Sequence, residues 1–195
     1  MGDHYYTEVP GSAHAERAVT VRALGQEMTF VTDAGVFSRD GLDRGTELLL
    51  EALPPLSGRV LDLGCGWGAV GVALGKRWPG LDIVMTDINS RAVELARRNL
   101  AENGVKATVV QGDGFQSVAG DFDAIVTNPP IRAGKAVIYG LFAQARDHLK
   151  PDGALYVVIR KQQGAPSALK YLKEVYARAE TVDRGSGFHV LRAQL

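Results

Sequence analysis

The sequence predicts an α/β protein built on a doubly wound, mostly parallel sheet. Strand-like and helix-like segments alternate along most of the chain. The apolar run at residues 154–159 is continuous, as in strands that are buried on both faces of a parallel sheet. Glycines alternate at residues 64–68, directly after a short apolar strand, where such folds bind ligands. With 195 residues, of which 46% are hydrophobic, a single domain over residues 1–195 is expected.

The first 45 residues are expected to form an extension that precedes the alternating region, residues 46–195. Two short apolar runs, residues 18–24 and 28–32, flank a Gly-Gln pair and predict a β-hairpin. A glycine-rich loop follows at residues 35–45. Thr46 is then expected to cap a helix that ends near residue 53, because two prolines follow it.

From residue 59 the pattern predicts strands and helices in turn. The first four strands are expected at residues 60–63, 81–86, 107–111 and 122–127. One helix is expected between the first two strands, at residues 69–78, and another after the second strand, capped by Asn89 or Ser90.

The clearest helix spans residues 136–150, where apolar residues recur at helical spacing. A Pro-Asp-Gly turn leads from it into the strand at residues 154–159, and a further helix is expected at residues 167–178. Two last strands, around residues 181–183 and 189–193, are joined by a Gly-Ser-Gly link that is too short for anything but an antiparallel pair. The prediction is a seven-stranded sheet with an antiparallel last strand.

Composition limits the possible functions. The chain carries 22 basic and 22 acidic residues, so contact with nucleic acid has to come from a local patch. The single cysteine, Cys65, rules out an internal disulfide framework and a cysteine zinc cluster. The four histidines show no ligand spacing, so no metal is expected. The chain has no secretory signal and no apolar run of the ~20 residues that a membrane span needs, so a cytoplasmic location is expected.

A nucleoside cofactor is indicated at the end of the first sheet strand. Gly64, Cys65 and Gly66 let the chain turn sharply while the backbone approaches a ligand closely. Residues 66–71 formally match the dinucleotide fingerprint, and Asp87 ends the second strand, where an acid holds ribose hydroxyls. Taken alone, this match allows NAD as well as other nucleosides.

Two details favour S-adenosylmethionine over NAD. Asp62 precedes the glycines, where it can meet the ammonium group of a methionine. Asp113 and Gly114 follow the third strand, where an adenine amino group can bind. S-adenosylmethionine carries no phosphate, so its own carboxylate can occupy the positive end of the following helix.

The motif Asn128-Pro129-Pro130-Ile131 ends the strand at residues 122–127. An exocyclic amine of a nucleobase is a poor nucleophile, and it needs acceptors for its N–H groups rather than a strong base. The Asn128 side-chain oxygen and a neighbouring backbone carbonyl can be those acceptors. The prolines restrict the backbone and contribute no competing N–H. An ordinary turn is the alternative, because Asn-Pro is a common turn opener.

These motifs together resemble class I S-adenosylmethionine-dependent methyltransferases, and within them the "methyltransferase small" group that modifies exocyclic amines. The blocks at residues 35–38, 43–46, 131–135 and 188–192 look like those of small-subunit (16S) ribosomal RNA guanine-N2 methyltransferases. Residues 2–7 are similar to a short, single-domain bacterial branch of that group. The resemblance spans most of the chain. It implies a Rossmann-like methyltransferase sheet and methyl transfer to guanine N2, with ribosomal RNA or the small ribosomal subunit as partner.

The resemblance also implies roles for individual residues. Orientation of the amine falls to Asn128, Pro129 and Pro130. Cofactor contacts are implied for residues at the strand ends, namely Asp62, Gly64, Cys65, Gly66, Asp87, Ile88, Asp113, Gly114 and Asn128. RNA contacts are implied for the residues around them, namely Phe37, Arg39, Ile131, Arg132 and Lys135.

One departure concerns Ile131, because many amino-methyltransferases place an aromatic ring there to stack on a flipped base. Such stacking contributes roughly 1–3 kcal/mol per base, so Phe37 or Arg132 is expected to compensate. Longer members carry a second, degenerate half for which this chain has no room. RNA docking is then expected from the hairpin, from a homodimer or from the ribosomal particle. Methylation of adenine N6 or of a glutamine amide, and a non-catalytic role in ribosome assembly, remain as alternatives.

Overall fold

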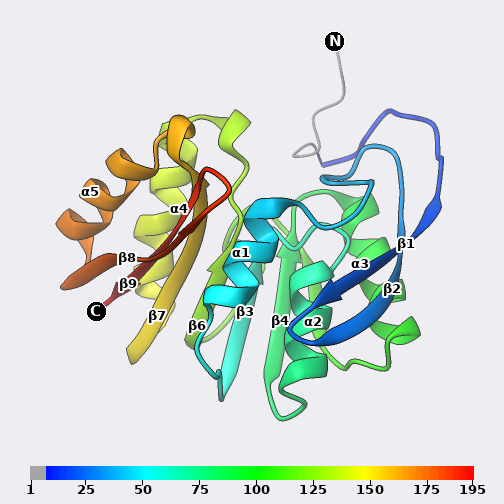
Figure 1. Cartoon of the computed structure of the whole chain (residues 1–195), viewed down its shortest axis with the longest axis horizontal. Coiled ribbons are helices and arrows are strands. Elements are labelled where there is room, and N and C mark those ends of the chain that lie inside the picture. The colour runs from blue at the N-terminus through cyan, green and yellow to red at the C-terminus, as the bar shows by residue number, and fades with distance from the viewer. Residues whose placement is uncertain (1–7) are drawn as a thin grey trace.

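The computed structural model describes residues 8–195, so the motif at residues 2–7 lies outside the described part. The first element is an antiparallel hairpin of β1 (Arg17–Ala23) and β2 (Gln26–Thr32), as the sequence predicts. Leu24 and Gly25 have positive φ angles of 52° and 73°, typical of a two-residue turn that matches the twist of the strands. The hairpin is separate from the main sheet and packs beside α3 (Figure 1).

Seven strands form the main sheet in the order β5-β4-β3-β6-β7-β9-β8. The strands from β5 to β7 are parallel, and β9 is antiparallel to both β7 and β8, which confirms the predicted topology. The bounds are β3 (Arg59–Leu63), β4 (Asp82–Asp87), β5 (Thr108–Gln111), β6 (Phe122–Thr127), β7 (Leu149–Arg160), β8 (Arg178–Gly185) and β9 (Phe188–Gln194).

Helices cover both faces of the sheet (Figure 1). One apolar core lies between the sheet and three helices, α1 (Arg44–Ala52), α2 (Ala69–Arg77) and α3 (Ser90–Glu102). The second core lies under α4 (Lys135–Asp147) and α5 (Ala165–Val175). Two short 3-10 helices, η1 (Ile131–Ala133) and η2 (Lys161–Gln163), follow β6 and β7. The central strands read as continuous apolar runs because both cores use them.

Three predicted boundaries are wrong. The helix expected at residues 167–178 is α5 and ends at Val175, because Arg178 already pairs with Gln194 of β9. Thr46 does not cap α1, because the cap is Asp43, whose carboxylate accepts hydrogen bonds from two N–H groups of the first turn. The helix expected up to residue 150 ends at Asp147, since Leu149 already pairs with Phe122 at the start of β7. The Pro-Asp-Gly segment therefore forms an irregularity within the strand rather than a turn before it.

The parallel strands all end at one edge of the sheet. β3 pairs with β4 on one side and with β6 on the other, which makes this the switch point where open α/β sheets bind ligands. Leu63 lies level with Thr86 and Thr127, so the loops after three neighbouring strands leave the sheet side by side. Within residues 8–195, every helix is too short or too polar to span a bilayer.

Candidate active site

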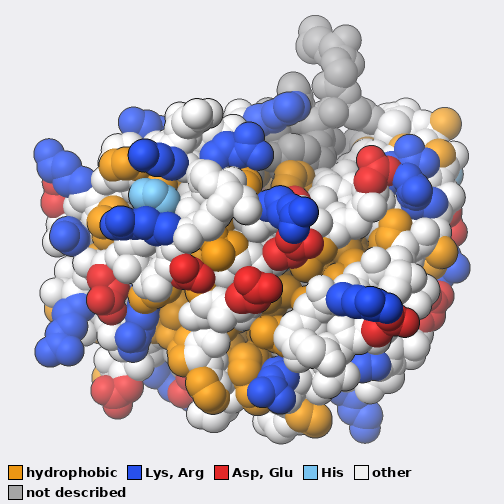
Figure 2. Space-filling view, viewed as in Figure 1, with side chains coloured by type: hydrophobic (Ala, Val, Ile, Leu, Met, Phe, Trp, Pro, Cys, Tyr) orange, Lys and Arg blue, Asp and Glu red, His pale blue; other side chains and the backbone are white. Residues whose placement is uncertain are grey.

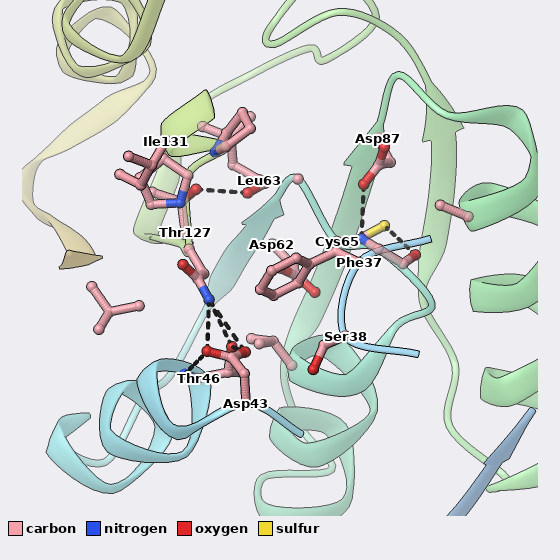
Figure 3. A pocket seen from close by; sticks show the side chains of 18 of the residues that line it. Phe37, Ser38, Asp43, Thr46, Asp62, Leu63, Cys65, Asp87, Thr127 and Ile131 are labelled. Atoms are coloured by element: carbon pink, nitrogen blue, oxygen red, sulfur yellow. Dashed lines mark hydrogen bonds between the residues drawn. The ribbon is translucent and has the colours of Figure 1, made fainter. Parts of the chain in front are cut away.

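A cavity of about 930 Å³ opens at this edge of the sheet. Its walls come from the loops after the parallel strands and from the segment that leads into α1 (Figure 3). Figure 3 shows Cys65 and Asp87 on one side of the cavity and Thr127 and Ile131 on the other, with Phe37 between them. The volume is in the range of small-molecule and cofactor sites.

The loop after β3 turns its backbone towards the cavity. Gly64 and Gly66 have φ angles of 76° and 54°, which glycine adopts without strain. A Cβ at either position would meet no atom within 4 Å, so a side chain there would take space from the cavity. The Gly64 and Cys65 N–H groups donate to the Thr86 carbonyl at 2.9 Å, and the Gly66 N–H donates to the Asp87 carboxylate at 2.8 Å. These bonds hold an open cradle that a ligand can approach closely.

Two acids flank this cradle, of which Asp62 is buried and Asp87 is partly exposed. Asp62 is 2% exposed, and one of its carboxylate oxygens accepts a hydrogen bond from the Gly71 N–H, in the first turn of α2, at 3.0 Å. Burial raises the pKa of Asp62 to about 7, and the nearby charge of Asp87 adds to the rise. Burial also raises the pKa of Asp87, against hydrogen bonds from the backbone of Asn89 and Gly66. A cationic group bound here would favour the ionised form of both acids.

Asn128 stands directly after β6, on the other side of the cavity. Its Nδ2 donates to Thr46 Oγ1 at 2.9 Å and lies 3.4 Å from both carboxylate oxygens of Asp43 (Figure 3). The Thr46 hydroxyl donates its hydrogen bond to the Asp43 carboxylate at 2.5 Å. Its oxygen can therefore only accept a hydrogen bond from Asn128. This order of protons fixes the amide, with the NH₂ group towards α1 and Oδ1 away from it. No residue of the described part donates to that Oδ1.

The strand end that carries Asn128 is held in place. Thr127 Oγ1 donates to the Leu63 carbonyl at 2.8 Å, which ties the ends of β6 and β3 together. Pro129 and Pro130 follow and line the cavity. Their rings restrict the backbone and leave no N–H that competes for an acceptor. The position of the amide is therefore set from both sides.

The segment before α1 forms a third wall. Trp67 is 3% exposed, and its indole N–H donates to the Phe37 carbonyl at 2.9 Å. The Phe37 ring lines the cavity and is 39% exposed. The Ser38 hydroxyl donates to the Gly41 carbonyl at 2.5 Å and closes a tight turn. Trp67, which by sequence looks like a packing residue, therefore also positions a ring at the cavity.

Most of the predicted site residues line the cavity. They are Phe37, Asp62, Gly64, Cys65, Gly66, Asp87, Ile88, Asp113, Gly114, Asn128, Pro129, Pro130, Ile131 and Arg132. Arg39 and Lys135 do not line it. Arg39 donates to the Ala15 carbonyl at 2.8 Å, and Lys135 is exposed at the start of α4. A contact with a substrate inside the cavity is therefore not supported for these two residues.

Several cavity residues were not assigned to the site from sequence, among them Asp43, Thr46 and Phe188, whereas Arg160 is a residue that by sequence could line an RNA groove at the strand ends. Asp43 and Thr46 form an Asp-x-x-Thr pattern, which indicates the start of a helix. The pattern does not indicate that this helix start contacts Asn128. Arg160 and Phe188 pair between β7 and β9, and the guanidinium lies 4.9 Å from the ring centroid. Their contact depends on a strand register that cannot be read from the sequence.

Comparison with known proteins identifies the family. A model described as the methyltransferase small domain matches residues 27–192. The chain belongs to the methyltransferase small family. Among its relatives, the uncharacterized protein YbxB of Bacillus subtilis is 39% identical over 100% of this chain and 99% of that protein. Ribosomal RNA small subunit methyltransferase C of Aeromonas hydrophila is 39% identical over 84% of this chain and 48% of that protein.

A solved methyltransferase that this chain resembles shows the same fold. The T. thermophilus 16S rRNA N2 G1207 methyltransferase (RsmC), in complex with AdoMet and guanosine, superimposes with a TM-score of 0.82 and 31% identity, covering 92% of this chain and 50% of that chain. This methyltransferase therefore spans about half the length of its methyltransferase C relatives. The family and this structure confirm the predicted fold and S-adenosylmethionine as the cofactor.

Proposed function

We propose that this methyltransferase transfers the methyl group of S-adenosylmethionine to the exocyclic N2 of a guanine in small-subunit ribosomal RNA. The observation that carries the proposal is the fixed Asn128 amide, which turns an acceptor oxygen away from α1 at the wall of a cofactor-sized cavity. An exocyclic amine needs such an acceptor to hold its N–H groups. The relatives named ribosomal RNA small subunit methyltransferase C, and the neighbour solved with guanosine, support the same substrate.

The glycine cradle and the acids beside it are proposed to hold the cofactor, which when bound supplies a methyl group activated by a sulfonium. Asp62 has one carboxylate oxygen on Gly71, which leaves the other for the ammonium group of the methionine part. Asp87 is proposed to meet the ribose hydroxyls, and Asp113 the adenine amine. Thr86 Oγ1 is buried at the same wall and makes no hydrogen bond within the described residues, as expected where a polar ligand binds.

Asn128 is proposed to orient the guanine amine for in-line transfer. Its Oδ1 accepts one N–H of the amine, and a backbone carbonyl of the turn at Pro129 accepts the other. The N–C bond forms as the S–C bond breaks, and the nitrogen, now strongly acidic, releases its proton to water. Positioning and electrostatic placement therefore carry the reaction. Asp43 and Thr46 are positioning residues, because they act through the amide of Asn128.

A guanine that has been turned out of its helix needs a surface to stack on. Ile131 lines the cavity but offers no ring. Phe37 lines it too, and the indole of Trp67 fixes the backbone behind that ring. We therefore assign base stacking to Phe37, which would compensate for Ile131.

Labelled methyl transfer to undermodified small subunits, to naked 16S RNA and to DNA, followed by nucleoside analysis, tests the proposal. The expected product is N2-methylguanosine. Small subunits should be methylated faster than naked RNA, because a chain with no net charge has little long-range attraction for free RNA.

The other outcomes of this experiment are distinct. N6-methyladenosine, or label in protein glutamine, would replace guanine as the acceptor. Cofactor binding without any transfer would indicate a non-catalytic assembly role. Asn128→Ala should lose most turnover while keeping its affinity for S-adenosylmethionine, and near-normal turnover in that variant would remove Asn128 from the mechanism.

A further inference from the structure

Basic side chains gather where β7 ends and the β8–β9 hairpin turns. Arg160 ends β7 and Lys161 begins η2, while Arg184 and His189 are paired residues of the hairpin. The Lys161 N–H donates to the Gly187 carbonyl at 2.8 Å, which fixes η2 against the hairpin turn. We call Arg160, Lys161, Arg184 and His189 the hairpin rim. Figure 2 shows Lys and Arg side chains around a histidine in this region of the surface.

The hairpin rim has no acidic partner among the described residues. Arg160, Lys161 and Arg184 are exposed and form no ion pair there. Eight cations elsewhere in the described chain are paired with acids, whereas others, such as Lys106 and Arg178, are unpaired like those of the rim. The adjacent acid, Asp183, accepts a hydrogen bond from the backbone N–H of Arg184 at 2.7 Å. The rim differs from the other unpaired cations because its members lie beside one another, with Arg184 paired to His189 and Lys161 near enough to act on the same ring.

The pKa of His189 reflects the positive charge of the hairpin rim. Its side chain lies on the same face as that of Arg184, since the two residues are direct partners across the strands. Partial burial lowers the pKa of His189, and the positive charges of Arg184 and Lys161 lower it further. Three cationic positions thus act on one another, an arrangement that a bound anion would relieve.

The hairpin rim is continuous with the cavity. Arg160 and Phe188 line the cavity, and the guanidinium lies over the ring, so the rim begins at the substrate wall and runs outwards to Lys161 and Arg184. Lys135 extends the surface, because its Cε would lie 3.7 Å from a Cβ on Gly164, directly after η2. A planar cation on an aromatic ring beside flexible cations suits an RNA strand, which offers both bases and phosphates.

We propose that the hairpin rim binds the phosphates that flank the target guanine and so docks ribosomal RNA at the cavity. This inference rests on the proposed function, because it takes the substrate to be RNA. It gives Lys135, which does not reach the cavity, a place on the docking surface instead. It also explains how a chain with equal numbers of acids and bases can bind a polyanion, since the free positive charge is local.

The test compares two double variants of the full chain. Lys161→Gln/Arg184→Gln removes two charges from the hairpin rim. Lys106→Gln/Arg178→Gln is the matched control, because both residues are exposed, form no ion pair within the described part, and Arg178 lies at the opposite end of the strand that carries Arg184. The measurement is fluorescence anisotropy with a short labelled fragment of 16S RNA over a series of salt concentrations.

The rim variant should bind the RNA roughly tenfold more weakly at low salt, and the slope of log affinity against log salt should fall by about 1.4, or 0.7 for each lost phosphate contact. The control should keep wild-type affinity and slope, and both variants should keep wild-type S-adenosylmethionine affinity and melting temperature. Equal RNA affinity in the two variants overturns the inference. The inference is also overturned if the wild-type protein binds polyglutamate as tightly as it binds RNA, because the surface would then recognise an acidic protein.

Methyl transfer by the same variants separates the two proposals. If the wild type makes no N2-methylguanosine but the rim variant still loses RNA binding, the proposed function fails and the docking surface stands. If the wild type makes N2-methylguanosine and the rim variant binds RNA normally, the docking surface alone fails.

Discussion

Changing Asp43 to asparagine should reverse the orientation of the Asn128 amide while leaving the helix cap in place. In the native protein, Thr46 donates to the carboxylate and accepts from Asn128. An asparagine at position 43 caps α1 as well as aspartate does, but it can offer an NH₂ group to Thr46. The Thr46 proton is then free to point at Asn128, where it pairs with Oδ1 and turns the NH₂ group outwards. The guanine amine would meet a donor in place of an acceptor.

The size of the effect follows from the network. In the native protein, Asn128 Nδ2 donates to Thr46 and lies 3.4 Å from both carboxylate oxygens of Asp43. If the Asn128 amide were flipped, it would lose the bond to Thr46, and Oδ1 would face those two carboxylate oxygens instead. With Asp43→Asn, the flipped form gains about one hydrogen bond, or roughly 1–2 kcal/mol. The productive orientation then falls by about five- to thirtyfold, and kcat should fall by the same factor. The affinity for S-adenosylmethionine should not change, because Asp43 contacts Asn128 and the first turn of α1 and makes no hydrogen bond to the glycine cradle.

Steady-state methyl transfer, cofactor titration and thermal melting check this together. Thr46→Ser keeps the hydroxyl and should be close to wild type, whereas Thr46→Val removes it and should resemble Asp43→Asn. Wild-type kcat in Asp43→Asn would refute the proton order. A loss of kcat with an equal loss of cofactor affinity or of melting temperature would point to a structural role instead.

The remaining predictions concern the acid and the glycine cradle that are proposed to hold the cofactor, and the Phe37 wall of the cavity. Because the pKa of Asp62 is raised to about 7, the folded protein binds the extra proton between about pH 4 and pH 7, so its cofactor-free stability should fall as pH rises through that window. Affinity for the cationic cofactor should rise about eightfold from pH 6 to pH 7.5, and calorimetry on Asp62→Asn should show no such rise. Gly66→Ala places a methyl group in the cradle and should weaken cofactor binding more than tenfold. Gly25→Ala is the control, because Gly25 in the hairpin turn has a similar positive φ and open space around it, and this variant should keep wild-type cofactor affinity. Trp67→Phe removes the bond to the Phe37 carbonyl, and a raised KM for RNA with an unchanged cofactor affinity is expected from kinetics.

The order of strands and helices could be predicted because each element carries its own local signal. The central strands are continuous apolar runs, and β6 begins and ends at the residues that the pattern gives. The end of α4 could not be predicted, because Leu149 is drawn into the sheet by a partner in β6 that is distant in sequence. Tertiary pairing decides such boundaries rather than local preference.

The candidate site could be predicted where its residues stand directly at strand ends, as Asp62, Asp87 and Asn128 do. Arg39 is close to Phe37 in sequence, but the turn closed by Ser38 sends its guanidinium to the Ala15 carbonyl instead. The role of Asp43 depends on the start of α1 facing the end of β6, and that approach is visible only once the chain is folded.

Opposite charges are separated on this methyltransferase, and the separation accounts for both of its expected ligands. Asp62 and Asp87 lie at the cavity, where the cationic cofactor proposed above would offset their charge. Other acids form ion pairs with arginines of the surface. The unpaired cations of the hairpin rim are then free to act on an approaching polyanion, although the whole chain has no net charge. RNA binding by this chain should therefore depend on a few identifiable side chains, of which Lys161 and Arg184 do not line the cavity and can be removed without touching the cofactor site.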